Sequence, residues 1–247
     1  NYNPTHIIVT NIDADHLDYY KDLDDIKKAF QEFVDKLPES GTLTTHTDVE
    51  LSTKATKINA DYIDARTIDL SVLGKHNKRN AQLALALSDA LGFDQNEARK
   101  GLLMFNGTWR RLEYKGVWHD IAMYDDYGHH PTEVKATLQA LREKYHHDKY
   151  KVIAVFQPHL FSRTKEHLDE FAHSFVDADV TCILPIYGAR EVDDGTISSH
   201  DLVEKTQGAI YMETFEEIKK YVLSKPHYNT VLITIGAGSV STFHDTL

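Results

Sequence analysis

The sequence predicts an α/β fold in two domains, residues 1–106 and 107–247, the second with a Rossmann-like and mostly parallel sheet. Three observations lead to this prediction. Short apolar runs typical of buried strands alternate with segments in which apolar residues recur at helical spacing. Strands that alternate with helices in this way build βαβ units, in which neighbouring strands lie parallel. The composition, with 41% hydrophobic and 26% charged residues, is that of a globular protein with a buried core.

The first domain opens with an apolar run that predicts a buried strand. The stretch from about 40 to 70 is polar, short and poorly periodic, and no element is assigned to it. Gly92 follows the last apolar residue of a long helical pattern, as a C-terminal capping glycine does. The predicted elements are a strand at 6–10 and helices at 22–35, 75–91 and 96–105.

The second domain, after Asn106, shows the alternation more clearly. Strand candidates alternate with helix candidates, as in helix 131–145, whose apolar residues lie on one face. The predicted strands are 109–116, 118–124, 151–156, 180–186, 209–212 and 230–235, and the predicted helices are 131–145, 164–176, 199–206 and 214–223.

Charge and composition exclude several classes of protein. The net charge is −11 and no block of Lys and Arg occurs, so neither nucleic acid nor a membrane surface is expected as a partner. No stretch approaches the roughly 20 apolar residues of a membrane helix. Cys182 is the only cysteine and lies in an apolar run, which predicts a buried, inert thiol in a cytoplasmic protein. The opening Asn-Tyr-Asn-Pro has no initiating Met or signal segment, which predicts a chain that begins inside a domain.

Three loops of the second domain combine chemically active side chains, and each follows a predicted strand. In an open parallel sheet, ligands bind beyond the carboxyl ends of the strands. We therefore expect the carboxylates, histidines, arginine and bare backbone turn of these loops to lie at one edge of the sheet. The loops are Asp125–Pro131, Gln157–Thr164 and Gly236–Ser239.

Each loop also has a plain structural interpretation. His130 and Pro131 make a good helix start, where the histidine could serve only as a cap. The same helix N-terminus offers N–H groups to a phosphate or carboxylate, and the preceding Asp126 and Tyr127 favour that function. Adjacent histidines seldom point at one ion, so a metal site at His129 and His130 is disfavoured. A Gly-Ala-Gly-Ser turn alone is a weak signal.

Two stretches of the first domain carry side chains of the kind that bind ligands. The loop 10–18 holds three Asp and one His after a strand, which suits a hard cation near phosphates as well as it suits a solvated acidic loop. Asn77 and Asn80 are three residues apart and share a helical face, where their amides match the edge of adenine. The plain alternative for this pair is a polar helix cap.

These motifs, in this order, resemble those of the Mur ligases. The run Thr10–His16 is similar to the central-domain loop whose histidine binds magnesium, which implies that His16 is a metal ligand. The run Gly-Lys-His-Asn-Lys-Arg-Asn-Ala is similar to the helix start that contacts adenine, which assigns Asn77 and Asn80 to the base. Trp-Arg-Arg-Leu-Glu is similar to the arginine pair at the domain junction, which assigns Arg111 to the ATP phosphates.

The second domain carries the most specific part of the resemblance. Asp125–Glu133 closely matches the branch of the family that adds L-alanine, and Phe156–His159 is similar to the loop that receives the amino acid and the muramoyl carboxylate. The resemblance implies these roles: Asp126 at the ribose, Tyr127 near the base, His129 at the phosphate region, and His159 and Arg163 at the amino acid and its acceptor.

The resemblance covers nearly the whole chain and implies a reaction. The first domain is expected to be the C-terminal part of a central ATPase-type α/β domain. The implied activity is ATP-dependent amide-bond formation through an acyl phosphate, with ATP and Mg²⁺ as cofactors and UDP-N-acetylmuramate and L-alanine as substrates. We expect this chain alone to be inactive as a ligase.

Several features depart from the family pattern. Neither the P-loop motif Gly-x-x-x-x-Gly-Lys-Ser/Thr nor a segment resembling the N-terminal UDP-binding domain occurs, and the 44–70 stretch is shorter than usual. Leu160 stands where many relatives carry a basic residue, and Ser239 replaces a common Asp. The alternatives are a ligase that recycles murein tripeptide onto the same nucleotide and a non-catalytic nucleotide-binding module. A Rossmann oxidoreductase is least favoured, since no Gly-x-Gly-x-x-Gly is present.

Overall fold

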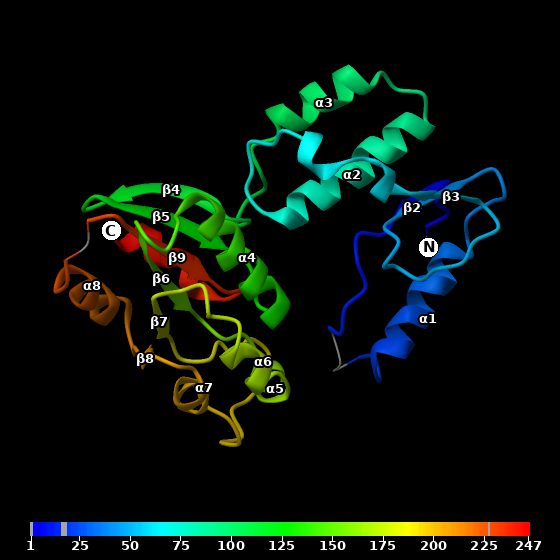
Figure 1. The fold of residues 1–247 in the computed structure, drawn as a ribbon. Helices are drawn as coiled ribbons and strands as arrows, with labels where there is room; N and C mark the ends of the chain where they lie inside the picture. The colour runs from blue at the N-terminus through cyan, green and yellow to red at the C-terminus, as the bar shows by residue number, and fades with distance from the viewer. Residues whose placement is uncertain (1, 16–18, 227) are drawn as a thin grey trace. The chain divides into compact units, whose positions relative to one another are not determined.

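Two sheets organise the chain. The computed structural model describes residues 2–15, 19–226 and 228–247, and the chain divides into two compact units, Asn1–Asn106 and Gly107–Leu247. Each unit combines parallel strands with helices, which confirms the predicted α/β class (Figure 1). Among the described residues, no helix has both the length and the apolar character that crossing a membrane requires.

The first unit contains a small parallel sheet in the order β1-β2-β3. Thr42 of β2 lies opposite His6 of β1 and Thr56 of β3. The elements of this unit are β1 (His6–Ile8), α1 (Leu23–Val34), β2 (Thr42–Thr45), β3 (Thr56–Asn59), α2 (Lys75–Ala90) and α3 (Gln95–Met104).

Strands β2 and β3 lie in the stretch to which the sequence assigns no element, so that interpretation is wrong. The sequence of β2 looks polar because it is rich in Thr, yet Thr44 and Thr45 are fully buried. β-Branched side chains favour strands, and the Thr45 hydroxyl donates a hydrogen bond to the Val9 carbonyl at 3.1 Å. Because the polar side chains of this strand are buried, its sequence pattern did not indicate a core strand.

The two longer helices of the first unit, α1 and α2, each bury one face. Val34 of α1 packs with Leu43 of the sheet, and Leu83 of α2 packs in a second cluster with Ile68. Gly92, directly after α2, has φ +76°, the left-handed conformation expected of a capping glycine. The helix therefore ends where the sequence predicts.

The second unit contains a six-stranded sheet in the order β4-β5-β9-β6-β7-β8. β4 runs antiparallel to β5, and every other neighbouring pair is parallel, as predicted. The strands are β4 (Glu113–Trp118), β5 (Ile121–Asp126), β6 (Lys151–Phe156), β7 (Val180–Ile183), β8 (Ala209–Tyr211) and β9 (Thr230–Ile235). The helices are α4 (Pro131–Lys144), α5 (Phe161–Glu166), α6 (Leu168–Ala172), α7 (Ser199–Lys205) and α8 (Phe215–Leu223).

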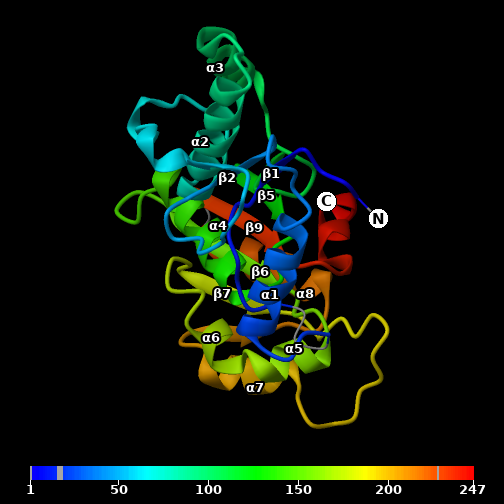
Figure 2. The same ribbon diagram turned by 90° about the vertical axis from the view of Figure 1, so that its right-hand side faces the viewer.

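Both faces of this sheet are covered. Leu138 of α4 packs with Phe156 on one face, whereas Ile218 of α8 and Phe243 of the C-terminal 3-10 turn pack on the other. Figure 1 shows α4 and α8 on opposite sides of the strands, and Figure 2 shows α6 and α7 side by side. Cys182 lies in this core, where burial raises the pKa of its thiol to about 12, in line with the expected inert cysteine.

Two predicted elements of the second unit differ in the structure. The single helix predicted at 164–176 is wrong: α5 ends at Glu166, the next residue His167 has a φ of −106° and a ψ of 26°, which are not helical, and α6 follows. No Gly or Pro marks this break, so the pattern gives no sign of it. The first two strands begin a few residues later than predicted, because the hairpin turns at His119 and Asp120, both with positive φ.

Candidate active site

Three loops meet at the carboxyl edge of the six-stranded sheet. They follow β5, β9 and β6, which are adjacent and parallel. The Gly236 N–H donates to the Asp126 carbonyl at 3.1 Å, and the Gln157 N–H donates to the Ile235 carbonyl at 3.0 Å. The topology therefore brings together loops that lie far apart in the sequence.

The Gly-Ala-Gly-Ser turn is a close-approach turn between these loops. A Cβ on Gly236, whose φ is +148°, would lie 2.7 Å from the Gln157 carbonyl oxygen. A Cβ on Gly238 would lie 2.5 Å from Gln157 Oε1 and 2.7 Å from Tyr187 Cγ. Ser239, which departs from the family pattern, bonds the Gln157 side chain through its hydroxyl at 3.2 Å. The glycines are required by packing, and the turn holds Gln157 in place.

Asp126 organises the backbone at the end of β5. Its carboxylate accepts the Gly128 N–H and the Leu112 N–H, both at 2.7 Å. Burial raises the pKa of this carboxyl, while the two N–H groups act in the opposite direction. The Tyr127 N–H donates to the Arg110 carbonyl at 2.7 Å, so β5 clamps the segment 110–112 at two points.

The two arginines of that segment have different environments. Arg110 is buried, donates from Nε to Asp125 at 2.7 Å and from Nη2 to the Gly236 carbonyl, and lies over the Tyr127 ring. Arg111 is 54% exposed, and its Nη1 lies 3.4 Å from Glu133 Oε1. The buried arginine fixes the backbone, and its neighbour presents a guanidinium at the edge.

Glu133 lies at the centre of the site, although no role follows for it from the sequence motifs. It occupies the third position of α4 and accepts the N–H groups of His129 at 2.9 Å and His130 at 3.2 Å. Burial opposes its ionisation, but these N–H groups and the charges of His129 and Arg111 lower the pKa of Glu133 below its usual range. His130 Nδ1 accepts the Thr132 N–H at 3.3 Å, so this histidine caps the helix. The signal for Glu133 was the capping box itself.

His129, His159 and Arg163 lie beside Glu133 and one another at the same edge of the sheet. His129 Nδ1 lies 3.2 Å from the Tyr127 carbonyl, and its ring centroid is 6.1 Å from that of His159. Arg163 Nη1 lies 3.4 Å from His159 Nδ1. Burial lowers the pKa of His159, and the charges of Arg163 and His129 lower it further. Arg111, Glu133, His129, His159 and Arg163 thus form a connected row along one edge.

The remaining predicted residues belong to the first unit. Asn77 lies in the first turn of α2 and donates from Nδ2 to the Leu73 carbonyl at 2.6 Å, and Asn80 lies exposed one turn further. His16 falls outside the described residues. Within the described part of the chain, no three His, Cys, Asp or Glu side chains gather as a metal site would need. We therefore assign magnesium to no described residue.

His46 connects the carboxyl ends of β2 and β3 to helix α2. Its Nδ1 lies 2.5 Å from Asp61 Oδ1, and its Nε2 lies 3.1 Å from the Arg79 carbonyl. Hydrogen bonds from Thr47, followed by that from His46, lower the pKa of Asp61 to about 2 despite some burial. This buried histidine, which no motif indicates, holds the start of α2 against the sheet edge.

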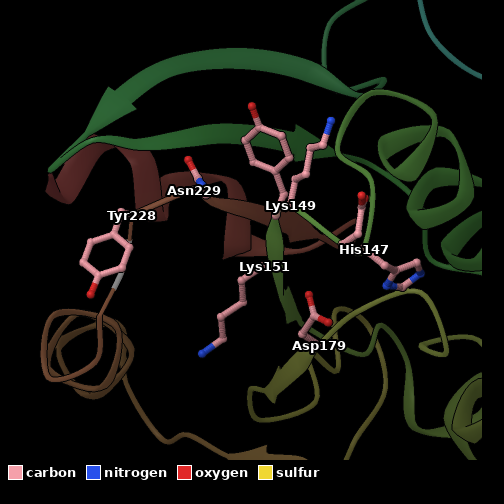
Figure 3. Close-up of a pocket in the computed structure, with 8 residues that line it drawn as sticks. His147, Lys149, Lys151, Asp179, Tyr228 and Asn229 are labelled. Atoms are coloured by element: carbon pink, nitrogen blue, oxygen red, sulfur yellow. The ribbon is translucent and has the colours of Figure 1, made fainter.

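A hollow of about 460 Å³ lies at the opposite, amino edge of the six-stranded sheet (Figure 3). Lys149 and Lys151 line it near the start of β6, and Tyr228 and Asn229 line it before β9. None of the predicted site residues lies there. The hollow is therefore separate from the three-loop site.

Comparison with known families identifies the fold. Residues 110–238 match the Mur ligase, glutamate ligase domain, and residues 1–65 match the Mur ligase middle domain. The chain belongs to the Mur ligase family. This Mur ligase chain is 37% identical to the UDP-N-acetylmuramate–L-alanine ligase of Lachnospira eligens over 279 residues, which cover 97% of the chain and 60% of the relative. The chain thus spans about 60% of the length of the curated relatives it matches.

Solved structures share the fold of this Mur ligase chain. The UDP-N-acetylmuramate-alanine ligase of Thermotoga maritima has a TM-score of 0.74 at 24% identity and covers 99% of this chain, which covers 59% of that protein. The folylpolyglutamate synthase of Mycobacterium tuberculosis, complexed with ADP and AMPPCP, has a TM-score of 0.71 at 17% identity, with coverages of 99% and 63%. At these identities the likeness concerns the fold alone.

Proposed function

We propose that this Mur ligase chain works in an ATP-dependent ligase that joins L-alanine to UDP-N-acetylmuramate. The observation that carries the proposal is the row of cationic and imidazole side chains, from Arg111 to Arg163, along the carboxyl edge of the sheet. The net charge of the whole chain is −11, which makes such a row unusual in it. The activity named for the relative from Lachnospira eligens agrees with it.

The proposed reaction forms one amide bond in two steps. The muramoyl carboxylate takes the γ-phosphoryl group of ATP and releases ADP, and the alanine amine then displaces phosphate and loses a proton. Bound magnesium would supply charge neutralisation at the phosphates. Within the chain, the exposed guanidinium of Arg111 would offset the repulsion between carboxylate and phosphate. The buried ion pair of Arg110 holds the backbone that carries it.

His159 would present a hydrogen-bond donor to the acceptor substrate. Its Nδ1 faces the donor Nη1 of Arg163, so the neutral imidazole carries its hydrogen on Nε2. Because burial lowers the pKa of His159, the neutral form prevails near pH 7. Nε2–H and Arg163 could then orient a carboxylate or an oxyanion between them.

The nucleotide assignments rest on the residues at the end of β5. Both carboxylate oxygens of Asp126 hold backbone N–H groups and the Thr137 side chain bonds to it as well, but a carboxylate accepts about four hydrogen bonds, which leaves capacity for a ribose hydroxyl. Tyr127 is 36% exposed and offers a ring on which a base can stack. The assignment of Asn77 and Asn80 to the base, and of His16 to magnesium, remains a proposal from the family resemblance.

Calorimetry of this chain with ATP and Mg²⁺ tests the nucleotide site. We expect saturable binding that Tyr127→Ala weakens roughly tenfold, since stacking on a base contributes about 1–3 kcal/mol. Tyr228→Ala, which removes a 79% exposed tyrosine from the opposite edge, is the matched control and should bind as the unmodified chain does. Equal affinities for both variants would refute the assignment.

The amine substrate requires a separate assay in a protein of the relatives' full length that contains this chain. Phosphate release with UDP-N-acetylmuramate should depend on L-alanine. Release that depends on murein tripeptide instead would replace the proposal with the recycling ligase. ATP binding without release in the presence of either amine would indicate a non-catalytic nucleotide-binding module.

A further inference from the structure

The loop after β7, Tyr-Gly-Ala-Arg-Glu at residues 187–191, forms a wall beside the loop after β6. The Tyr187 N–H donates to the Pro158 carbonyl at 2.8 Å, and the Leu160 N–H donates to the Tyr187 carbonyl at 2.9 Å. The rings of Tyr187 and His159 stack at 5.7 Å with an interplanar angle of 19°. The two loops are thus joined in register at His159.

The far end of the same loop is anchored as well. Glu191 accepts the Ser162 N–H at 3.0 Å and its hydroxyl at 2.5 Å. Although burial opposes ionisation, these bonds, and after them the positive charge of Arg190, lower the pKa of Glu191, so its carboxylate is engaged within the wall. A Cβ on Gly188 would lie 2.8 Å from the ring of Phe161, so the wall packs tightly there.

Two residues in these facing loops have strained backbones. Leu160 has φ +72° and Ala189 has φ +51°, although neither is glycine. Such conformations are unfavourable for residues with a side chain, persist where the surroundings enforce them and gather at ligand sites. Leu160 directly follows His159 in the loop after β6, and Ala189 directly precedes Arg190 in the loop after β7.

The charge of the wall complements the site. Leu160 is only 7% exposed and uncharged, so the β6 loop supplies a single guanidinium, that of Arg163, next to His159. Arg190 is exposed and lies between the two anchored ends of the wall. Its charge adds to burial, Arg163 and His129 in lowering the pKa of the His159 imidazole, while the carboxylate of Glu191 on the same loop acts in the opposite direction. Two guanidinium groups therefore act on one imidazole.

We propose that Arg190 is a second carboxylate-binding residue of this site, acting with Arg163, and that Tyr187 forms the wall beside it. A carboxylate has two oxygens that two guanidinium groups can share, so the site would take a free α-amino acid rather than its amide. This inference rests on the proposed ligase function, because it names the residue that selects the amine substrate. It assigns a role to a loop that no motif indicates.

Proton NMR of the His159 imidazole tests the inference on this chain, with L-alanine and L-alaninamide as ligands. L-Alanine should shift the resonance saturably and L-alaninamide should not. R190Q should weaken L-alanine binding about fivefold or more, since a charge-assisted contact is lost, and R190K should restore part of it. R66Q, which removes a 90% exposed arginine paired with Asp64, is the matched control and should change nothing.

A second measurement needs no ligand. The pKa of His159 should rise in R190Q, because a nearby positive charge is removed. An unchanged pKa, unchanged L-alanine binding in R190Q, or no saturable shift in the unmodified chain would each overturn the inference. ATP titration of the same sample separates the two proposals. If the chain binds L-alanine in an Arg190-dependent way but does not bind ATP, only the nucleotide assignment is contradicted.

Discussion

Each edge of the six-stranded sheet is organised by a buried arginine paired with an aspartate, and the two pairs serve different ends. At the carboxyl edge, Arg110 and Asp125 are both almost fully buried and lie 2.7 Å apart. At the amino edge, Arg142 is equally buried and lies 2.6 Å from Asp179, whose side chain is 36% exposed. Burial of an ion pair therefore does not by itself distinguish a functional edge from a structural one.

The difference lies in what each arginine holds. Arg142 donates to the carbonyls of Asp177, Tyr145 and Tyr150, and so holds together the loops that lead into β6 and β7. The hollow beside it, shown in Figure 3, is lined by lysine and tyrosine side chains of chain segments before β6 and β9. Arg110 instead fixes the backbone next to Arg111, which extends the row of charged groups. The pair at the carboxyl edge therefore positions an exposed cation, which supports the proposed site there.

Replacing the aspartate of each pair should give the largest difference between the two pairs, measured as the free energy of unfolding. Asp125→Ala should lower the free energy of unfolding by about 3–5 kcal/mol, because it leaves the buried charge of Arg110 without its counterion. Asp179→Ala should cost only about 1–2 kcal/mol, because Arg142 keeps three carbonyl partners. Urea unfolding of both variants measures this. Equal losses would show that the two pairs are energetically equivalent.

Arg111→Ala should have the next largest effect, on binding rather than stability. The free energy of unfolding should change by less than about 0.5 kcal/mol, because the side chain is 54% exposed. The affinity for ATP should fall about tenfold or more, since a hydrogen bond to a charged group contributes about 1.5–3 kcal/mol. Lys151→Ala, in the amino-edge hollow, is the control. Unaltered ATP binding by Arg111→Ala would remove Arg111 from the site.

Burial decided which parts of the fold the sequence could predict. The bounds of β6 and β9 match the predicted 151–156 and 230–235, because strands buried on both faces are continuous apolar runs. β2 was hidden, because three of its four buried positions are threonines, and the hydroxyl of Thr45 finds its partner only in the folded chain. Periodicity detects apolar burial and misses polar burial that is satisfied by a distant residue.

The candidate site could be predicted only where the hydrogen-bond partners of a motif lie within the motif itself. The loop at Asp125–Pro131 folds largely on itself and on the first turn of α4, as its residue types suggest. The order β5-β9-β6 places the last strand between two earlier ones, which no local pattern encodes. Local patterns also do not show that Arg110 is buried against Asp125 while Arg111 stays exposed. Nor do they show that the Tyr187 N–H bonds to the Pro158 carbonyl of another loop.

The smallest expected effect concerns the pH dependence of stability at the carboxyl edge. The folded-state pKa of His159 is lowered by burial and then by Arg163, so folding disfavours its proton. The unfolded chain therefore binds more protons below the ordinary histidine pKa of about 6.5, and stability falls as pH falls through that region. Above it, the contribution of the neutral imidazole is fully present.

His159→Gln should flatten this part of the pH profile. Urea unfolding at several pH values between about 5 and 7.5 should show a smaller loss of stability at low pH in the variant than in the unmodified chain. Part of the slope should remain, because burial also lowers the pKa of His244, which bonds Thr234 behind the sheet at 2.8 Å. Identical slopes would mean that His159 is protonated as easily in the folded chain as in the unfolded one. The proposed orientation of a neutral Nε2–H toward the substrate would then lose its physical basis, and the protonated imidazole would add positive charge to that of the arginines at the carboxyl edge as the pH falls.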